Sequence, residues 1–183
     1  MSGALSALIE FWVRILFSLF AYAVLLRFFL QWVKADFYNP ICQLLCRVTS
    51  PLLKPLRKII PGLGGMDFAA VVLAYLTWLV QSIILMLLQG QGVSPALFIV
   101  ALIQLILGAL SLYTWLIIFR VIASWLNPNN YNPAIVVLFQ LTEPVLTKIR
   151  QRLPTNQSGL DFAPMIAILI LFSLQILVKG FFF

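Results

Sequence analysis

Two sets of charged side chains recur at matching positions along the sequence and are suited to ion pairing or anion binding. The first set is Arg27, Arg57 and Asp67, and the second set is Arg120, Arg150 and Asp161. Each arginine is 93 residues from its counterpart, and one residue inserted after Pro154 makes the aspartate spacing 94. A guanidinium can hold a carboxylate through two parallel hydrogen bonds. The recurrence indicates a tandem duplication of one structural unit.

The duplicated stretches also share residues that are typical of helix starts. These are Asn39, Pro40, Thr49 and Pro51 in the first copy, and Asn132, Pro133, Thr142 and Pro144 in the second, with Glu143 beside them. Asparagine followed by proline is typical of an N-cap and a first helical residue. Threonine with a proline two residues later predicts that a helix restarts there. The aspartates stand where an N-cap would begin the next helix, and we rate this capping role ahead of catalysis. The arginines remain as the functional candidates.

No combination of residues in the sequence predicts an active site. The chain has no histidine and no phosphate-binding loop, and Glu143 has no carboxylate neighbour in the sequence. Cys42 and Cys46 are four residues apart and are predicted to be isolated, reduced thiols on one helix face. A metal or haem site is the less favoured alternative, because the second copy has Ile135 and Phe139 there. We therefore expect a protein that is not an enzyme and has no cofactor.

The elements that position these residues are membrane spans. The chain is 63% hydrophobic and 9% charged, whereas soluble domains carry about 25% charged residues. A span needs about 20 apolar residues. We predict four spans, at about 4–33, 67–89, 96–126 and 161–178. The net charge of +7 then indicates loops that stay cytoplasmic, and it does not point to nucleic acid.

The duplication divides the chain into a first repeat, residues 1–92, and a second repeat, residues 93–183. Each repeat holds two spans joined by a basic connector, at 39–61 and 132–154. Both connectors alternate apolar and basic residues at helical spacing, which favours amphipathic helices on the membrane surface over helices that dip into the bilayer. With both connectors cytoplasmic, both termini lie outside, and the two repeats run parallel. The predicted fold is an all-α membrane protein with four transmembrane helices, built from two tandem parallel helical hairpins with interfacial helical connectors.

This arrangement brings the arginines and aspartates to a similar depth. Arg27 and Arg120 lie near the cytoplasmic end of the first span of each repeat, and Asp67 and Asp161 begin the second. An arginine at the edge of the apolar region needs a partner or must extend to the headgroups. We predict Arg27–Asp67 and Arg120–Asp161 pairs, either within each repeat or swapped across the repeat axis.

The order of these residues resembles the YggT family, also called YlmG, over nearly the whole chain. The resemblance rests on Arg, Trp, Asn-Pro, Thr-x-Pro, Arg, Pro and Gly-x-Asp-Phe-Ala, which follow one another in both copies. The first copy departs from the pattern, with Ser50 in place of the acidic residue and Ala70 in place of the last proline. The resemblance implies links to cytochrome maturation, including haem attachment, and to nucleoid distribution for plastid relatives. For bacterial relatives it implies cell division and osmotic or ion homeostasis.

Two functions follow as expectations. The first is a non-enzymatic assembly or scaffold factor of the bacterial inner membrane, whose connectors contact anionic headgroups and a membrane-protein partner through Arg57 and Arg150. The alternative is an oligomeric channel or transporter component in osmotic or ion homeostasis. A homo-oligomer fits either function, haem handling rests on the resemblance alone, and no direct nucleic-acid contact is expected.

Overall fold

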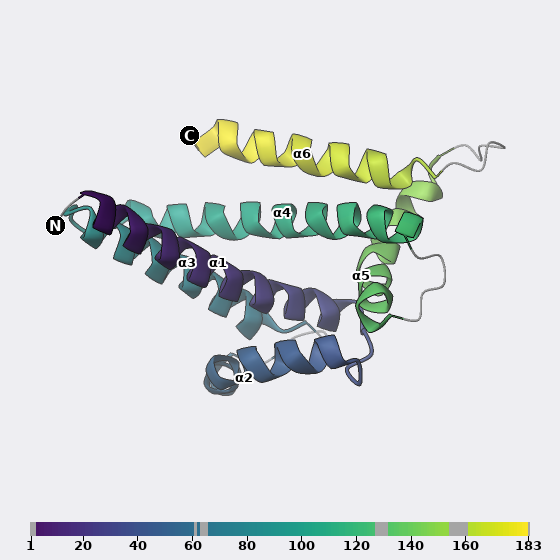
Figure 1. Cartoon of the computed structure of the whole chain (residues 1–183), viewed down its shortest axis with the longest axis horizontal. Helices are drawn as coiled ribbons and strands as arrows, with labels where there is room; N and C mark the ends of the chain where they lie inside the picture. The colour runs from purple at the N-terminus through teal and green to yellow at the C-terminus, as the bar shows by residue number, and fades with distance from the viewer. Residues whose placement is uncertain (1–2, 61, 63–65, 127–131, 154–160, 183) are drawn as a thin grey trace.

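The computed structural model describes residues 3–60, 62, 66–126, 132–153 and 161–182, and six α-helices account for most of them (Figure 1). The helices are α1 (Gly3–Trp32), α2 (Pro40–Ile59), α3 (Phe68–Leu88), α4 (Ala96–Leu126), α5 (Pro133–Arg150) and α6 (Ala163–Phe182). Four of them, α1, α3, α4 and α6, are long and apolar enough to cross a membrane. The predicted all-helical membrane fold with four spans is therefore confirmed. Helix α6 continues beyond the predicted end of the last span to Phe182.

The helices form two units of the same design. Helix α1 packs against α3, α4 packs against α6, and contacts between α3 and α4 join the units. Helices α1 and α4 run in the same direction in Figure 1, as parallel repeats require. Helix α2 follows the end of α1, and α5 lies across the ends of α4 and α6. The start of α1 and the end of α6 lie at the opposite end of the molecule from α5.

Small residues allow the two units to approach closely. Gly108 of α4 faces the indole of Trp78 on α3, and a Cβ at this position would lie 2.6 Å from Trp78 Cζ2. Real Cβ atoms do not approach other atoms this closely, so glycine is required there unless the indole moves. Trp78 belongs to a buried cluster with Ala21, Leu25 and Ala74 in the first unit. The contact between the units therefore depends on packing as well as on the short α3–α4 turn.

The connectors begin where the sequence predicts. The side chains of Asn39 and Asn132 accept hydrogen bonds from the amides of Ile41 and Ala134, each at 2.9 Å, and so cap α2 and α5. The side-chain Nδ2 of Asn39 also donates to the Pro133 carbonyl at 2.8 Å, which joins the starts of the two connectors. The asparagine caps are confirmed, and one of them has a second role between the units.

The predicted helix restarts at Thr49 and Thr142 are wrong. Helices α2 and α5 continue through these residues, and Pro51, Pro55 and Pro144 lie inside them. Each threonine hydroxyl donates to a carbonyl four residues earlier, at 2.7 Å, as helical threonines do. An interior proline removes one backbone hydrogen bond and bends a helix without always ending it, and α2 changes direction along its length in Figure 1. The final residues of the predicted connectors, 61 and 154, lie outside the described residues.

Candidate functional site

In the first repeat, a buried arginine joins the first span to the connector. Arg27 of α1 is 7% exposed, and its Nη1 donates to Thr49 Oγ1 at 2.6 Å and to Ser50 Oγ at 3.0 Å. The same nitrogen lies 3.3 Å from the Cys46 carbonyl, which also accepts from it. Thr49 is itself completely buried. All three acceptors are uncharged groups in the middle of α2, so Arg27 fixes the position of the connector without a carboxylate.

The second repeat builds the same contact with more partners. Arg120 of α4 is also 7% exposed, and its Nη1 donates to Thr142 Oγ1 at 2.9 Å. Its Nη2 forms an ion pair with Glu143. The Phe139 ring covers the guanidinium, with 4.4 Å between Arg120 Cζ and the ring centroid, which is a cation–π geometry. Arg120 therefore has a carboxylate and an aromatic face that Arg27 lacks.

A second arginine in each repeat joins the connector to the following span. Arg57 pairs with Asp67, with 3.1 Å from Nε to Oδ2 and a second contact from Nη2. Arg150 pairs with Asp161 in the same way, at 3.0 Å from Nε and 2.6 Å from Nη2. Arg150 Nη1 also donates to Glu143 Oε1 at 2.6 Å, so this glutamate bridges both arginines of its repeat. We call each set of two arginines with their partners an arginine clamp.

The clamps correct the ion pairs expected from the sequence. The predicted Arg27–Asp67 and Arg120–Asp161 pairs are wrong, and so are the swapped pairs across the repeat axis. The aspartates pair instead with Arg57 and Arg150 of the connectors. The physical reason is the course of the connector: its middle lies against the first arginine, and its end lies beside the aspartate that precedes the next span.

The two aspartates also differ as helix caps. Asp161 Oδ1 accepts from the Ala163 amide at 3.0 Å, as expected for a residue at a helix start. Asp67 makes no side-chain capping hydrogen bond to α3. Its carboxylate is almost fully buried against Arg57, which leaves the cap unformed. The capping prediction is thus confirmed for Asp161 and wrong for Asp67.

The clamp of the second repeat shifts the pKa values of its members. Burial would raise the pKa of Glu143, but hydrogen bonds from Arg120, Thr147 and Arg150 outweigh burial and lower it. The hydrogen bond from Arg150 holds the pKa of Asp161 below its ordinary value. The same bond raises the pKa of Arg150. All these groups therefore remain charged at neutral pH, which makes the clamp a fixed electrostatic contact.

Four partners of the clamp arginines were not among the site residues predicted from the sequence: Gln31, which accepts from Arg57 Nη2 at 3.5 Å, and Cys46, Ser50 and Phe139. A signal was available, because Cys46 aligns with Phe139 and Ser50 with Glu143 at the spacing of the duplication. The two thiols are unbonded, and burial raises the pKa of Cys42. No group of three or more cysteines and carboxylates could hold a metal ion within the part of the chain that the structure describes.

Comparison with known proteins gives the same two-part division. The family model CCB3/YggT matches the chain twice, at residues 6–88 and 99–182. An uncharacterized protein of Pseudomonas aeruginosa is 44% identical over 164 residues, which cover 88% of this chain and 83% of the relative. The Escherichia coli K12 protein named "Uncharacterized protein YggT" is 34% identical over 164 residues, covering 90% of this chain and 85% of that protein. No solved structure matches the chain. The chain therefore belongs to the CCB3/YggT family of membrane proteins.

Proposed function

We propose that this protein is a non-enzymatic scaffold of the bacterial inner membrane, whose two connectors present fixed surfaces to a membrane-protein partner. The observation that carries the proposal is the pair of arginine clamps. Each clamp ties the middle of a connector to the first span and its end to the second span. The first attachment of each clamp is a buried arginine and the second is an ion pair that is partly exposed, and together they hold the connector at two points. Such rigidity suits a docking surface.

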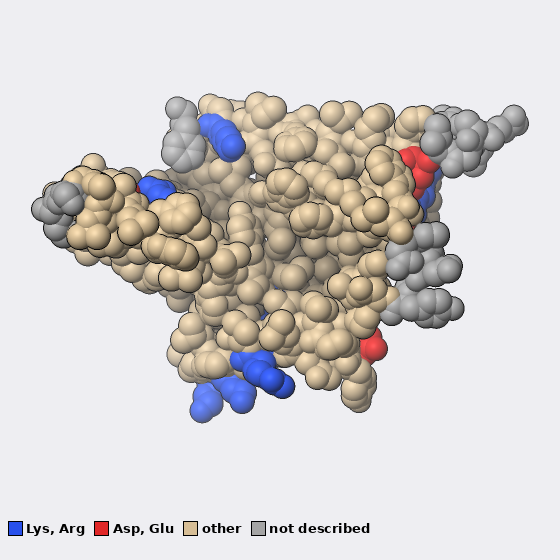
Figure 2. Space-filling model, viewed as in Figure 1, with Lys and Arg blue, Asp and Glu red and all other residues tan. Residues whose placement is uncertain are grey.

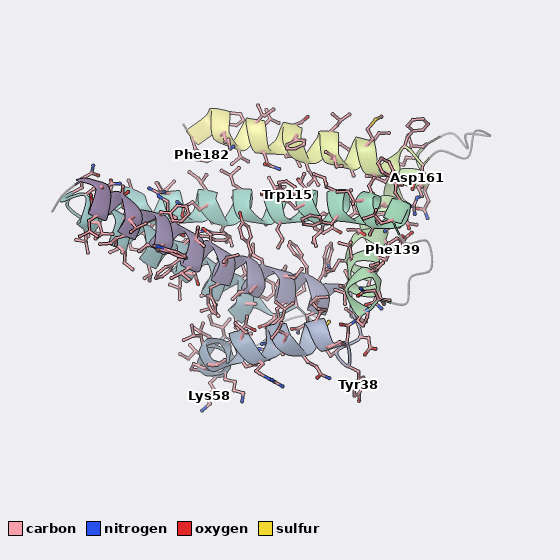
Figure 3. All side chains as sticks on the ribbon, in the orientation of Figure 1. Tyr38, Lys58, Trp115, Phe139, Asp161 and Phe182 are labelled. Atoms are coloured by element: carbon pink, nitrogen blue, oxygen red, sulfur yellow. The ribbon has the colours of Figure 1, made fainter. Side chains whose placement is uncertain are left out.

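The outer face of α2 has the chemistry of an interfacial surface. Arg47, Lys54 and Lys58 are exposed, and the side chain of Lys58 points away from the spans in Figure 3. Basic side chains gather along this edge of the molecule in Figure 2. The exposed Leu44, Val48 and Leu52 repeat at every fourth position beside them. Apolar and basic rows of this kind bind the headgroup region of anionic membranes, here on the cytoplasmic side with both termini outside.

The exposed face of α2 offers other residues than the sequence did for the contact with headgroups and partners. Arg57 and Arg150, expected from the sequence to meet headgroups and partners, have guanidiniums engaged with aspartates. The lysines of α2 are better suited to an outward contact, because they are exposed and form no ion pair among the described residues. Arg57 and Arg150 then act by holding the connector that carries the lysines.

Crosslinking in cells tests the scaffold. A photoreactive residue at Leu44 or Lys58 should capture one recurrent membrane-protein partner, whereas the same residue at Val93, which is exposed in the turn between α3 and α4, should not. A variant that weakens the first clamp, Arg27→Gln, should reduce capture at Leu44 and Lys58 while the chain remains in the membrane. Equal capture at Val93 and at the connectors would refute the proposal.

A channel or transporter component is the second candidate, favoured by one cavity. A volume of about 370 Å³ between α1, α3, α4 and α6 is lined by polar side chains, including Ser18, Gln81, Gln104 and Gln175. Polar groups inside membrane spans often mark a transport path, and repeat interfaces commonly hold such sites. Ion flux in proteoliposomes that is lost in Gln81→Leu or Gln104→Leu would support transport and overturn a scaffold-only role.

A further inference from the structure

The two arginine clamps differ in charge although they share one architecture. The second clamp places Arg120 and Arg150 against Glu143 and Asp161, so its charges balance. The first clamp places Arg27 and Arg57 against Asp67 alone. The chain has five carboxylate side chains, all of them among the described residues, and none forms an ion pair with Arg27. The first clamp therefore carries one uncompensated positive charge.

Two replacements between the repeats cause this difference. Ser50 stands where the second repeat has Glu143, and Cys46 stands where it has Phe139. The first replacement removes a carboxylate from the guanidinium, and the second removes the aromatic ring that covers its counterpart. Both replacements are smaller side chains. A cavity of about 730 Å³ also adjoins Arg120, so the two replacements do not create the space beside Arg27 but remove its anion and its aromatic partner.

In the first repeat, a cavity of about 460 Å³ adjoins this uncompensated guanidinium and is lined by Arg27, Gln31, Phe37, Cys46, Arg57, Gly62 and Asp67. Within the described residues, all three hydrogen bonds of Arg27 are donated by Nη1. Its Nε and Nη2 hydrogens have no acceptor among the described residues and can be donated to a ligand. A guanidinium stays charged under physiological conditions and matches the oxygen atoms of phosphates and carboxylates. Burying this charge without an anion is costly, and a bound anion would offset that cost.

We propose that the cavity of the first repeat binds a singly charged phosphodiester, which takes the place that the Glu143 carboxylate occupies in the second repeat. Arg27 supplies the charge and the hydrogen-bond donors, and the Ser50 hydroxyl lies beside it. The cavity lies at the end of α1 and the start of α3, at the depth where lipid headgroups meet the apolar spans. An anionic phospholipid presents this group there, and a free phosphate offers the same oxygen atoms. The site does not depend on the scaffold role, because it would exist whichever partner the connectors bind.

The test uses the full-length chain purified in detergent and measures its melting temperature during titration. The probes are short-chain phosphatidylglycerol, net-neutral phosphatidylcholine of the same chain length, and inorganic phosphate. A ligand that binds only the folded state raises the melting temperature with its concentration. We expect phosphatidylglycerol to raise it for the unchanged protein. Phosphatidylcholine carries the same phosphodiester, but its choline ammonium offsets that charge and is repelled by Arg27 and Arg57, so its effect should be much smaller. If inorganic phosphate produces the same rise, the natural ligand is a free anion, and if it does not, the ligand is the lipid.

Ser50→Glu is the decisive variant, because it copies the second repeat and supplies the missing carboxylate. It should raise the melting temperature without lipid and weaken phosphatidylglycerol binding by about tenfold or more, which corresponds to about 1.4 kcal/mol. Ser50→Gln is the matched control, because it adds the same bulk without charge and should retain more of the response. The proposal fails if Ser50→Glu responds to phosphatidylglycerol as the unchanged protein does, or if Ser50→Gln loses the response equally.

A second measurement uses the unchanged sequence, so its result does not depend on whether a variant folds. Cys46 lines the cavity and is partly exposed, whereas Cys42 is completely buried and serves as an internal reference. Phosphatidylglycerol should slow alkylation of Cys46 severalfold, and phosphatidylcholine at the same concentration should not. Alkylation of Cys46 at an unchanged rate in every probe would overturn the proposal.

Discussion

Replacing Thr49 and Thr142 by valine tests how much each arginine depends on its threonine. Valine has nearly the same shape but no hydroxyl, so both variants leave an arginine without one acceptor. Each threonine also donates to a carbonyl four residues earlier at 2.7 Å, so the loss of that bond is common to the two variants. The Thr142 hydroxyl also lies 3.4 Å from the Phe139 carbonyl, a long contact of small weight, so the difference between the variants reports chiefly on the arginine contacts.

The remaining contacts of each arginine set the expected loss of unfolding free energy. A hydrogen bond to a charged group contributes about 1.5–3 kcal/mol. Arg27 loses its shortest contact, 2.6 Å, and keeps only Ser50 and the Cys46 carbonyl, so Thr49→Val should destabilise the fold by about 2 kcal/mol. Arg120 keeps the ion pair with Glu143, so Thr142→Val should cost only about 1 kcal/mol. We expect the variant in the first repeat to be the less stable one.

The free energy of unfolding is measured on the full-length chain in mixed micelles, by raising the fraction of denaturing detergent and following tryptophan fluorescence. Thr77→Val is the matched control. Thr77 is buried in α3 and donates to the Leu73 carbonyl at 2.7 Å, with no arginine bonded to it. If Thr49→Val lowers the free energy of unfolding no more than Thr77→Val does, the contact between Arg27 and Thr49 adds no net stability. If Thr142→Val lowers the free energy of unfolding more than Thr49→Val does, the ion pair with Glu143 does not compensate Arg120 for the lost hydroxyl, and the argument is refuted.

Three further outcomes can be checked on the same protein. Gly108→Ala places a methyl group against the Trp78 indole and should destabilise the fold by about 1–3 kcal/mol in the same unfolding assay. Acid should weaken the second clamp, because folding lowers the pKa values of Glu143 and Asp161. The stability that these shifts provide is complete above the ordinary pKa values of 4.5 and 3.8 and is lost as the pH falls through the lower values of the folded state. Acid titration of Glu143→Gln should therefore show a smaller loss of unfolding free energy than titration of the unchanged protein. Asn39→Asp keeps the cap acceptor but removes the donor to the other connector, so it should cost about 1 kcal/mol more than the same change at the equivalent asparagine of the second repeat.

The sequence predicted the fold well because the membrane and the duplication constrain it strongly. Spans are decided by length and hydropathy, and α1, α3 and α4 match the expected ranges within a residue or two at each end. The asparagine caps could also be predicted, because their hydrogen bonds reach only two residues along the chain. Local chemistry of this kind can be read from neighbouring residues alone.

The partners of the arginines could not be predicted from the same sequence. Arg27 meets Thr49 across 22 positions, and this contact depends on how α2 folds back against α1. The proline after Thr49 suggested a break, but the helix continues because an interior proline removes only one hydrogen bond. Once α2 is continuous, the end of the connector brings Arg57 beside Asp67, and Arg27 is left with neutral acceptors. The comparison of Ser50 with Glu143, and of Cys46 with Phe139, is the signal in the sequence that could have indicated this asymmetry.

The hydrogen bond between Asn39 and the Pro133 carbonyl has a consequence for how such a chain arose. It joins the asparagine that caps one connector to the proline that begins the other, so adjacent positions of the two repeats meet at one contact. A polypeptide with a single repeat would present this contact to a second copy of itself, and a symmetric pair would form it twice. Fusion of two copies into one chain keeps the partners at a high effective concentration, so the contact need not be strong. Halves of this protein, expressed as separate chains, would then have to find each other by the affinity of their own interface.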